Sequence, residues 1–390
     1  MASTQHVLLS PAELAYLHGS LSLTPPLRPD GRAPAQFRPL SAETGILPGT
    51  NGSARICFAD GTEAIVGVKA EIEKTGSRYG AGNTLPGAEL IEAGGGGGGD
   101  DDDDDDGGGD DGGKRRRGGA VRGEPGWVEI AVEIPGTRDD DANTIYLAEM
   151  LAEALLADGE FVKRLWINRR FHWKLYLDIL LISPPLSYPL PLLSLTTHLA
   201  LLATRLPRLK SEGDEDPLFD DDWDSSTYLY PQEEGALGGR PPVTLLVMAV
   251  GNNIIFDPAK EELAVADCAL AISVADAARP SGAGADEVEA DGSERKQGLR
   301  LLSIRTIDPP SRLTPPGVPR SNDVATSAAG GQASQRPEAQ IQETEAVDGV
   351  WKAPRGGTKM AVLGAIIAKA LEKGGVADEV LDGLKAVELG

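Results

Sequence analysis

The sequence predicts an α+β fold of two similar halves that is interrupted by long insertions. Three observations predict it. Along the 390 residues, segments with strand periodicity are followed by segments with helix periodicity, and this order occurs twice. Three other segments have the composition of loops or insertions. Segment 74–120 has almost no apolar residues, 211–240 is acidic and contains Pro and Gly, and 277–346 is rich in Ala, Ser, Pro, Gly and Gln. When these segments are set aside, the remaining residues form one continuous pattern of strands and helices.

The negative charge of the chain is concentrated in two short segments. The net charge is −23, yet residues 94–113 consist only of Gly and Asp and hold nine Asp. Residues 211–224 add eight acidic residues and no basic residue. The charge of the rest of the chain is nearly balanced, so the acidic composition does not exclude an RNA-binding surface on the folded part.

The cysteines, the histidines and the apolar runs exclude several classes of protein. The chain has two cysteines, Cys57 and Cys268, which are too few for a disulfide scaffold or a thiolate metal cluster. Both lie in apolar, strand-like runs, which indicates buried, reduced thiols in an intracellular protein. The four histidines have no ligand spacing, so we expect no metal site and no cofactor. The most apolar stretch, 175–206, contains Asp178, His198 and four prolines, so we expect no membrane span.

The N-terminal segment, residues 1–27, contains the start signal of a helix. Ser10-Pro11-Ala12-Glu13 is a capping box, in which the Ser and Glu side chains each bind a backbone N–H. Three leucines at helical spacing then form an apolar stripe: Leu14, Leu17 and Leu21.

The first half, residues 28–210, begins with a hairpin. Segments 53–59 and 62–70 flank Asp60-Gly61, which we expect to form a two-residue turn. The insertion at about 74–120 then predicts disorder, because its like charges repel one another and it can bury little apolar surface.

A strand, a helix and a second strand complete the first half. The strands are expected at 127–134 and 173–182, and Asp139–Asp141 are expected to cap the helix between them. The helix has one apolar face: Ile145, Leu147, Met150, Leu151, Ala154 and Leu155.

An acidic linker, residues 211–240, leads to the second half, residues 241–390. Strands are expected at five places: 243–249, 253–257, 265–275, 299–307 and 349–353. A low-complexity insertion at about 277–346 surrounds the fourth of them. Two helices follow near 358–373 and 376–387, with Thr358 as a cap and Gly374-Gly375 between them.

Five short motifs occur in a fixed order: Arg28-Pro29-Asp30-Gly31-Arg32, Gly52-Ser53-Ala54-Arg55, Gly67-Val68-Lys69-Ala70-Glu71, Leu177-Asp178-Ile179-Leu180, and Asp257-Pro258 with Glu261-Glu262. In this order and spacing, the chain resembles the RNase PH family, and in particular the non-catalytic ring subunits of the eukaryotic RNA exosome. This branch is similar to the inactive partner of the archaeal ring. The resemblance covers essentially the whole chain outside the three insertions and implies an RNase PH-like fold of two βαβα-type halves.

The resemblance also implies partners and a process. It implies a hexameric ring of RNase PH-like subunits, RNA-binding cap subunits, and RNA threaded through the channel to an associated hydrolytic exoribonuclease. It implies 3′→5′ RNA processing and degradation, including rRNA maturation, in the nucleus, nucleolus and cytoplasm. Lys114–Arg117 is typical of a nuclear localisation patch, although the adjacent Asp residues could neutralise it.

The motif positions have a structural interpretation, with no catalytic role. We expect Arg28, Asp30, Gly31, Arg32, Asp178 and Asp257 to be structural. Arg28–Arg32 could also be a turn with a surface charge pair, and Asp257 with Glu261 and Glu262 could complement a helix dipole.

The chain lacks what phosphorolysis requires in active members of the resembled family. They use a carboxylate and a Gly-rich turn with Thr-Arg to hold the attacking phosphate. After Asp178, the next carboxylate is Glu212 and the next glycine is Gly213, while prolines occupy 183–193, which departs from the family pattern. We therefore expect that this protein is not an enzyme. The alternatives are a phosphorolytic 3′→5′ exoribonuclease and, from the Gly/Asp tract, an acidic protein-binding chaperone.

One basic stretch is the candidate for contacts with RNA or with a neighbouring subunit. Its cations are Lys163, Arg164, Arg169, Arg170 and Lys174, and they alternate with Phe161, Trp166, Phe171 and Trp173. Cations bind phosphates and aromatic rings stack on bases, so RNA contact is one interpretation. A subunit interface and an amphipathic edge strand with solvated bases are equally weighted alternatives.

Overall fold

The computed structural model describes residues 9–75, 123–138, 140–183, 186–231, 239–277, 298–317 and 350–389. The Gly/Asp tract 94–113, the basic patch Lys114–Arg117 and most of the predicted insertions at 74–120 and 277–346 lie outside these residues.

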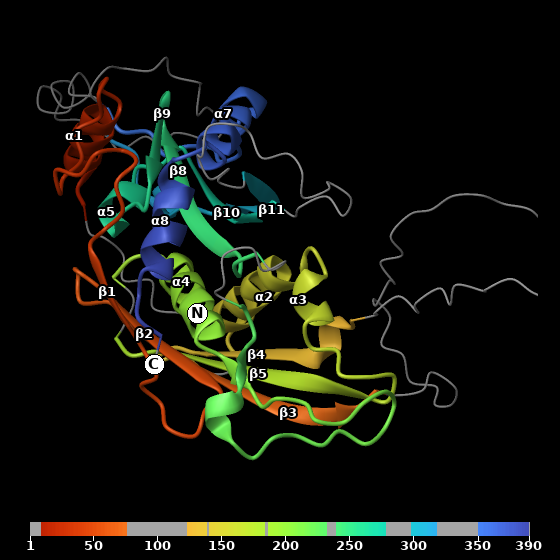
Figure 1. Cartoon of the computed structure of the whole chain (residues 1–390). Coiled ribbons are helices and arrows are strands. Elements are labelled where there is room, and N and C mark those ends of the chain that lie inside the picture. The colour runs from red at the N-terminus through yellow and green to blue at the C-terminus, as the bar shows by residue number, and fades with distance from the viewer. Residues whose placement is uncertain are drawn as a thin grey trace, which may run out of the picture.

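Two β-sheets form the framework of the described residues (Figure 1). The first sheet has the order β1-β2-β3-β5-β4 and is antiparallel except for β4, which runs parallel to β5. Its strands are β1 (Leu40–Thr44), β2 (Gly52–Phe58), β3 (Glu63–Lys74), β4 (Val128–Glu133) and β5 (Phe171–Leu181). The second sheet is antiparallel, with the order β11-β10-β8-β9. Its strands are β8 (Val243–Val250), β9 (Asn253–Phe256), β10 (Cys268–Asp276) and β11 (Leu299–Ile307).

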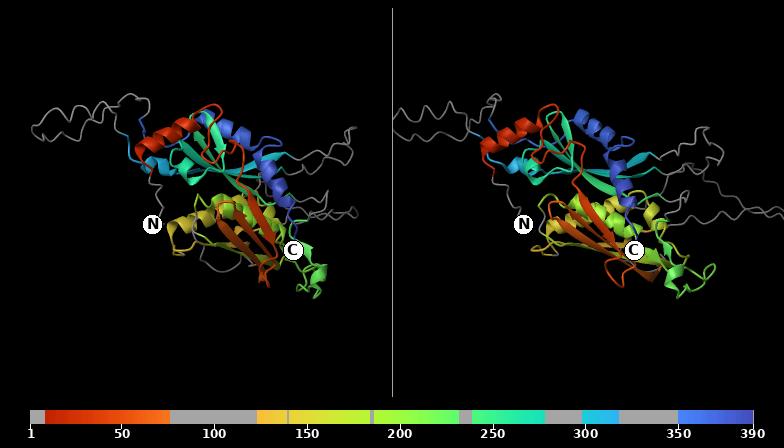
Figure 2. Two further views of the ribbon diagram at one scale, coloured as in Figure 1. Left: turned by 90° about the vertical axis from the view of Figure 1, so that its left-hand side faces the viewer. Right: turned by 60° about the vertical axis from the view of Figure 1, so that its left-hand side comes forward.

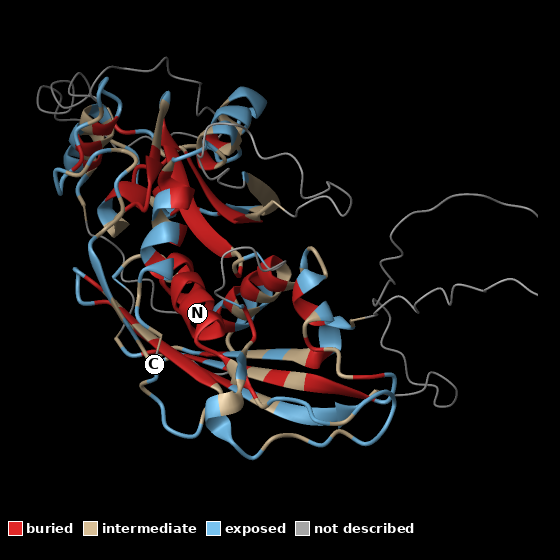
Figure 3. Cartoon of the chain, viewed as in Figure 1, coloured by how far each residue is buried: buried red, intermediate tan, exposed pale blue. Residues whose placement is uncertain are grey.

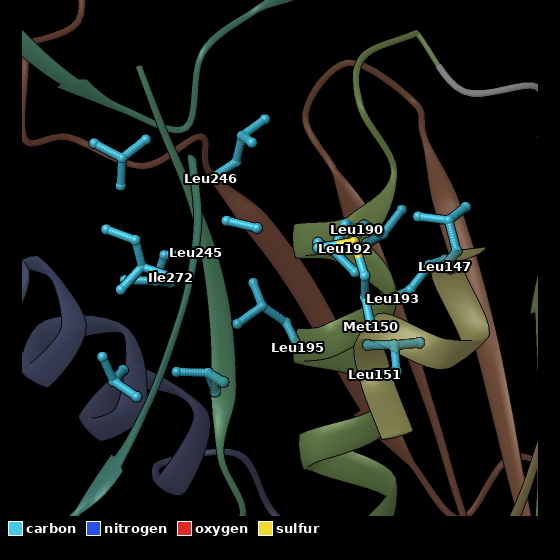
Figure 4. Close-up of a cluster of buried hydrophobic side chains, with 14 of the residues drawn as sticks. Leu147, Met150, Leu151, Leu190, Leu192, Leu193, Leu195, Leu245, Leu246 and Ile272 are labelled. Atoms are coloured by element: carbon cyan, nitrogen blue, oxygen red, sulfur yellow. The ribbon is translucent and has the colours of Figure 1, made fainter. Parts of the chain in front are cut away.

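A layer of helices fills the space between the two sheets. It consists of α2 (Ala142–Leu156), α3 (Glu160–Lys163) and α4 (Leu190–Leu202). Every residue of α4 is buried, because α4 contacts β2 and β3 on one side and β8 on the other. Figure 4 shows leucines of α4 and α2 packed together with residues of the second sheet. A mainly apolar helix fits this central place, and the hydroxyls of its Thr196 and Thr197 donate to carbonyls of the same helix.

The other α-helices of the described residues gather around the second sheet (Figure 2). They are α1 (Pro11–Leu21), α5 (Lys260–Leu263), α7 (Met360–Ala370) and α8 (Val376–Lys385). The first helix thus packs beside strands of the second half of the chain, and the Asn253 amide donates hydrogen bonds to the carbonyls of Leu21 and Leu23. Three short 3-10 helices complete the described residues: η1 (Pro125–Trp127), η2 (Trp223–Ser225) and η3 (Pro310–Leu313).

Several expectations from local signals are confirmed. The capping box of Ser10 and Glu13 is present, and Leu14, Leu17 and Leu21 are buried. The expected strand at 299–307 and the two last helices are also present. In α2, Asp141 is the N-cap, and the predicted apolar face is buried with one exception, since Ile145 is exposed.

Other expectations are wrong. The Asp60-Gly61 hairpin has a three-residue loop, because the Phe58 N–H bonds to the Thr62 carbonyl and only Gly61 has a positive φ. Residues 350–353 form no strand. Their Trp351 is buried and donates a hydrogen bond to Thr314. The N-cap of α7 is Lys359, not Thr358.

The segment after α4 is more ordered than a linker. Its short strands β6 (Arg205–Leu206) and β7 (Thr227–Tyr228) pair with each other. Leu229 and Tyr230 are buried, so residues 211–231 return to the first half (light green, below β3 in Figure 1). The boundary between the halves at 211–240 stays a prediction. Among the described residues, no helix combines the length and the apolar character needed to cross a membrane.

Candidate functional site

Arg28 of the first motif forms a buried ion pair with Glu262. The Arg28 Nε–Glu262 Oε1 and Nη2–Oε2 distances are both 2.8 Å, and both side chains are fully buried. Arg28 also donates to the carbonyls of Phe256 and Asp257. The Nε, Nη1 and Nη2 groups of Arg28 therefore all have acceptors, and the Glu262 carboxylate is the counter-ion of the buried guanidinium. The alternative that Arg28–Arg32 is only a surface charge pair is therefore wrong.

Asp257 is the second centre of this cluster. Its carboxylate accepts hydrogen bonds from Arg32 Nη1 at 2.7 Å and from Arg38 Nη2 at 2.7 Å. Its φ is +47°, in the left-handed region that Asp adopts more readily than most non-glycine residues. Interaction with a helix dipole does not fully account for Asp257 and Glu262. The helix α5 is only one turn long, and both carboxylates bind arginines.

Arg38 is a member of the cluster that the sequence analysis missed. Besides Asp257, it binds Asp60 of the hairpin loop and the Ser187 hydroxyl at 3.0 Å. It thus connects the proline-containing stretch before α4 to the second half. The signal was present as a third arginine shortly after Arg28 and Arg32. Its partners, however, are distant in sequence, since Asp257 lies 219 residues away and Ser187 lies 149 residues away.

Asp30 and Gly31 shape the turn that carries these arginines. Asp30 accepts from the Arg32 backbone N–H at 3.0 Å and from Arg32 Nε at 2.6 Å. The pKa of Asp30 is lowered overall: partial burial raises it, but the hydrogen bonds and positive charge of Arg32 and Arg28 outweigh that effect. Gly31 has a φ of +75°, where a glycine is favoured.

Asp178 lies apart from this cluster. It is exposed on the outer face of β5, beside Gly67 of β3 and Ala131 of β4. Its side chain makes no hydrogen bond or ion pair with another described residue. The predicted structural role of Asp178 therefore stays a prediction. Within the described part of the chain, no three His, Cys, Asp or Glu residues are placed to hold a metal ion.

The basic stretch has acidic or carbonyl partners throughout. Lys163 pairs with Glu160 at 2.6 Å, and Lys174 donates to the Gly126 carbonyl at 2.7 Å. The Arg164 guanidinium stacks 4.4 Å from the Tyr230 ring centre. Arg169 and Arg170 face acidic residues of the segment after α4.

The aromatic residues of this stretch belong to the core. Phe161, Phe171 and Trp173 are buried, and Trp166 is partly buried against the core. They are packing residues, so they offer no open stacking platform for bases. The edge-strand alternative stays open, because β4 pairs with β5 only from Leu175 onward and the Arg169 and Arg170 side chains are 78% and 55% exposed. Figure 3 shows buried residues along the middle of the first sheet.

The fold and these residues define a class: a two-sheet α+β protein whose sequence motifs build a contact between its halves. Two curated relatives support a specific family. The chain is 31% identical over 272 residues to exosome complex component RRP42 of Saccharomyces cerevisiae, covering 68% of this chain and 81% of the relative. It is 30% identical over 285 residues to exosome complex component rrp42 of Schizosaccharomyces pombe, covering 68% and 78%. The chain belongs to the Rrp42 family of RNase PH-like exosome ring subunits.

Solved structures are more distant. An archaeal exosome core has 17% identity and a TM-score of 0.43, covering 75% of this chain and 84% of that one. An Archaeoglobus fulgidus exosome with RNA bound to the active site has 17% identity and a TM-score of 0.44, covering 76% and 86%. These scores are too low to support the assignment, which rests on the two yeast relatives. No protein-family model matches the chain.

Proposed function

We propose that this chain is a non-catalytic structural subunit of the RNA exosome ring. The observation that carries the proposal is the 31% identity to a yeast exosome complex component, across 81% of that relative. In this role the chain supports 3′→5′ RNA processing and degradation, including rRNA maturation, by forming part of the channel that RNA traverses.

The surroundings of Asp178 support the non-catalytic part of the proposal. Phosphorolysis needs a carboxylate near groups that hold phosphate. Asp178 is exposed between Gly67 and Ala131, and neither residue has a cationic or hydrogen-bonding side chain. The sequence that follows offers no other carboxylate or glycine before Glu212. No observation favours the phosphorolytic alternative.

The proposed partners are other RNase PH-like ring subunits, RNA-binding cap subunits and an associated hydrolytic exoribonuclease. The two curated relatives are each named as a component of an exosome complex, which supports assembly with other subunits. We also propose that the protein acts in the nucleus, including the nucleolus, and in the cytoplasm.

Co-expression with RNase PH-like paralogues tests the assembly. A ring subunit has two heterologous interfaces, each burying roughly 2,000 Å² or more. The chain should therefore form a soluble stoichiometric pair with one paralogue, measured by size-exclusion chromatography with light scattering. A stable monomer that binds no paralogue would contradict the proposal.

A further inference from the structure

The acidic segment and the basic stretch, far apart in sequence, meet in the structure. Residues 208–220 form a small hairpin, in which the Lys210 N–H donates to the Leu218 carbonyl at 2.8 Å and the Asp220 N–H to the Arg208 carbonyl at 2.9 Å. We call residues 212–217 at its end the acidic tip. Phe219 anchors the hairpin, since its ring centre lies 5.0 Å from that of Trp173 on β5.

The acidic tip lies on the turn that precedes β5. The Asn168 side chain donates to the Glu215 carbonyl at 2.9 Å, and the Arg169 backbone N–H donates to Asp214 at 3.3 Å. Arg170 pairs with Asp216 at 2.9 Å, and Arg169 Nε lies 3.8 Å from the Asp214 carboxylate. Backbone and side-chain contacts together therefore fix the position of the acidic tip over Arg169 and Arg170.

The charges at this contact do not balance. Two arginines face an acidic tip that carries four acidic residues: Glu212, Asp214, Glu215 and Asp216. The acidic tip and the two arginines together therefore carry more negative than positive charge, although the two guanidinium groups remain at the surface. The Arg169 side chain is 78% exposed and that of Arg170 is 55% exposed. Exposed ion pairs of this kind are weak, so the acidic tip shields the arginines without locking them.

We propose that Arg169 and Arg170 form a binding site for RNA phosphates, and that the acidic tip occludes it by placing carboxylates where phosphates would bind. Both groups present oxygen anions to guanidinium donors, so they compete for the same N–H groups. The choice of RNA as the polyanion rests on the proposed function. The occlusion itself rests only on the contacts of the acidic tip.

Neutralising the acidic tip tests the proposal. The double variant Asp214→Asn with Asp216→Asn keeps side-chain oxygens that can accept hydrogen bonds but removes both charges that face the arginines. The control, Asp221→Asn with Asp224→Asn, removes the same charge from exposed residues of the same segment that pair with no described basic residue. Binding of a fluorescein-labelled single-stranded adenosine homopolymer is measured by anisotropy on the full chain.

The tip variant should lower the Kd by about fivefold or more relative to the control at about 50 mM salt, and the gain should shrink at about 200 mM. Adding Arg169→Gln and Arg170→Gln to the tip variant should abolish the gain. An equal gain in the control, no gain in the tip variant, or a gain that persists without the two arginines would each overturn the proposal.

Two further measurements distinguish occlusion of the arginines from a folding defect and from failure of the proposed function. Asp216→Asn alone, at a side chain that is 78% exposed, should give a smaller gain in the same direction without affecting folding. Pairing of the tip variant with a paralogue reports the proposed function separately. If the pair forms and RNA binding is unchanged, occlusion is wrong and the ring assignment stands.

Discussion

Arg28 and Glu262 are 234 residues apart in sequence, yet their side chains form a bidentate ion pair inside the protein. One partner precedes the first sheet and the other lies after β9 of the second sheet. With Arg32, Arg38 and Asp257 beside it, this pair holds the segment before the first sheet against residues that follow β9 by charge pairing.

Removing one partner of the Arg28–Glu262 pair should strongly destabilise the protein. Arg28→Ala leaves the Glu262 carboxylate buried without its counter-ion, which costs about 3–5 kcal/mol. For a domain of this size the thermal midpoint should fall by roughly 10 °C. Differential scanning calorimetry measures the fall, and Arg55→Ala is the control, because its pair with Glu63 is partly exposed. Equal effects of both variants would contradict the prediction.

The isolated chain should not degrade RNA with phosphate. The exposed Asp178 pairs across the sheet with Gly67 and Ala131, and neither residue supplies a cationic side chain. End-labelled RNA incubated with inorganic phosphate and magnesium should remain intact, with an active RNase PH-like subunit as the positive control. Release of nucleoside diphosphates that disappears with Asp178→Asn would refute the assignment.

Deleting the Gly/Asp tract 94–113 should leave stability almost unchanged. The tract has no apolar side chain to bury, and a shorter loop changes the closure free energy by less than ~1 kcal/mol. The thermal midpoint should stay constant or rise slightly, because repulsion among nine Asp residues is removed. A fall of about 5 °C or more would show that the tract makes native contacts.

His198 should make the protein less stable in acid. It is buried on α4, and this burial lowers its pKa to about 4, with Arg240 and Asp276 as charged neighbours. In the unfolded chain, the histidine pKa is about 6.5. Between these values the unfolded state binds the additional proton, so the free energy of unfolding decreases as pH falls from about 6.5 to 4, by roughly 3 kcal/mol in total.

Denaturant titrations across this pH range measure the effect. His198→Leu should show a smaller decrease than the wild type, whereas His18→Gln, at a partly exposed site, should follow the wild type. Parallel curves for all three proteins would show that His198 does not cause the acid sensitivity.

Local signals in the sequence predicted local structure well. Ser10 with Glu13 and the helix cap at Asp141 depend on contacts within a few residues, so their partners are visible in the sequence. The prediction for Ile145 was wrong: the apolar pattern places it on the buried face of the helix, but the pattern does not show whether another element covers that position.

Contacts between residues that are far apart in sequence could not be predicted from these local signals. No periodicity relates Arg38 to Asp257, so the cluster became visible only in three dimensions. The acidic composition of 211–240 concealed Phe219 and Tyr230, which anchor that segment to the first half. The basic stretch was recognised, but the acids that cover part of it come from a later segment, with Asp214 lying 45 residues after Arg169.

The position of α1 has a consequence for how the protein is made. A chain emerging from the ribosome exposes Leu14, Leu17 and Leu21 first, but the strands that α1 packs beside belong to the second half and are synthesised much later. At about 5–20 residues per second, these leucines remain without their partners for on the order of ten seconds or more. During that interval the nascent chain presents an unprotected apolar helix, which is a substrate for chaperones. Any truncation before the second sheet would make this temporary exposure permanent.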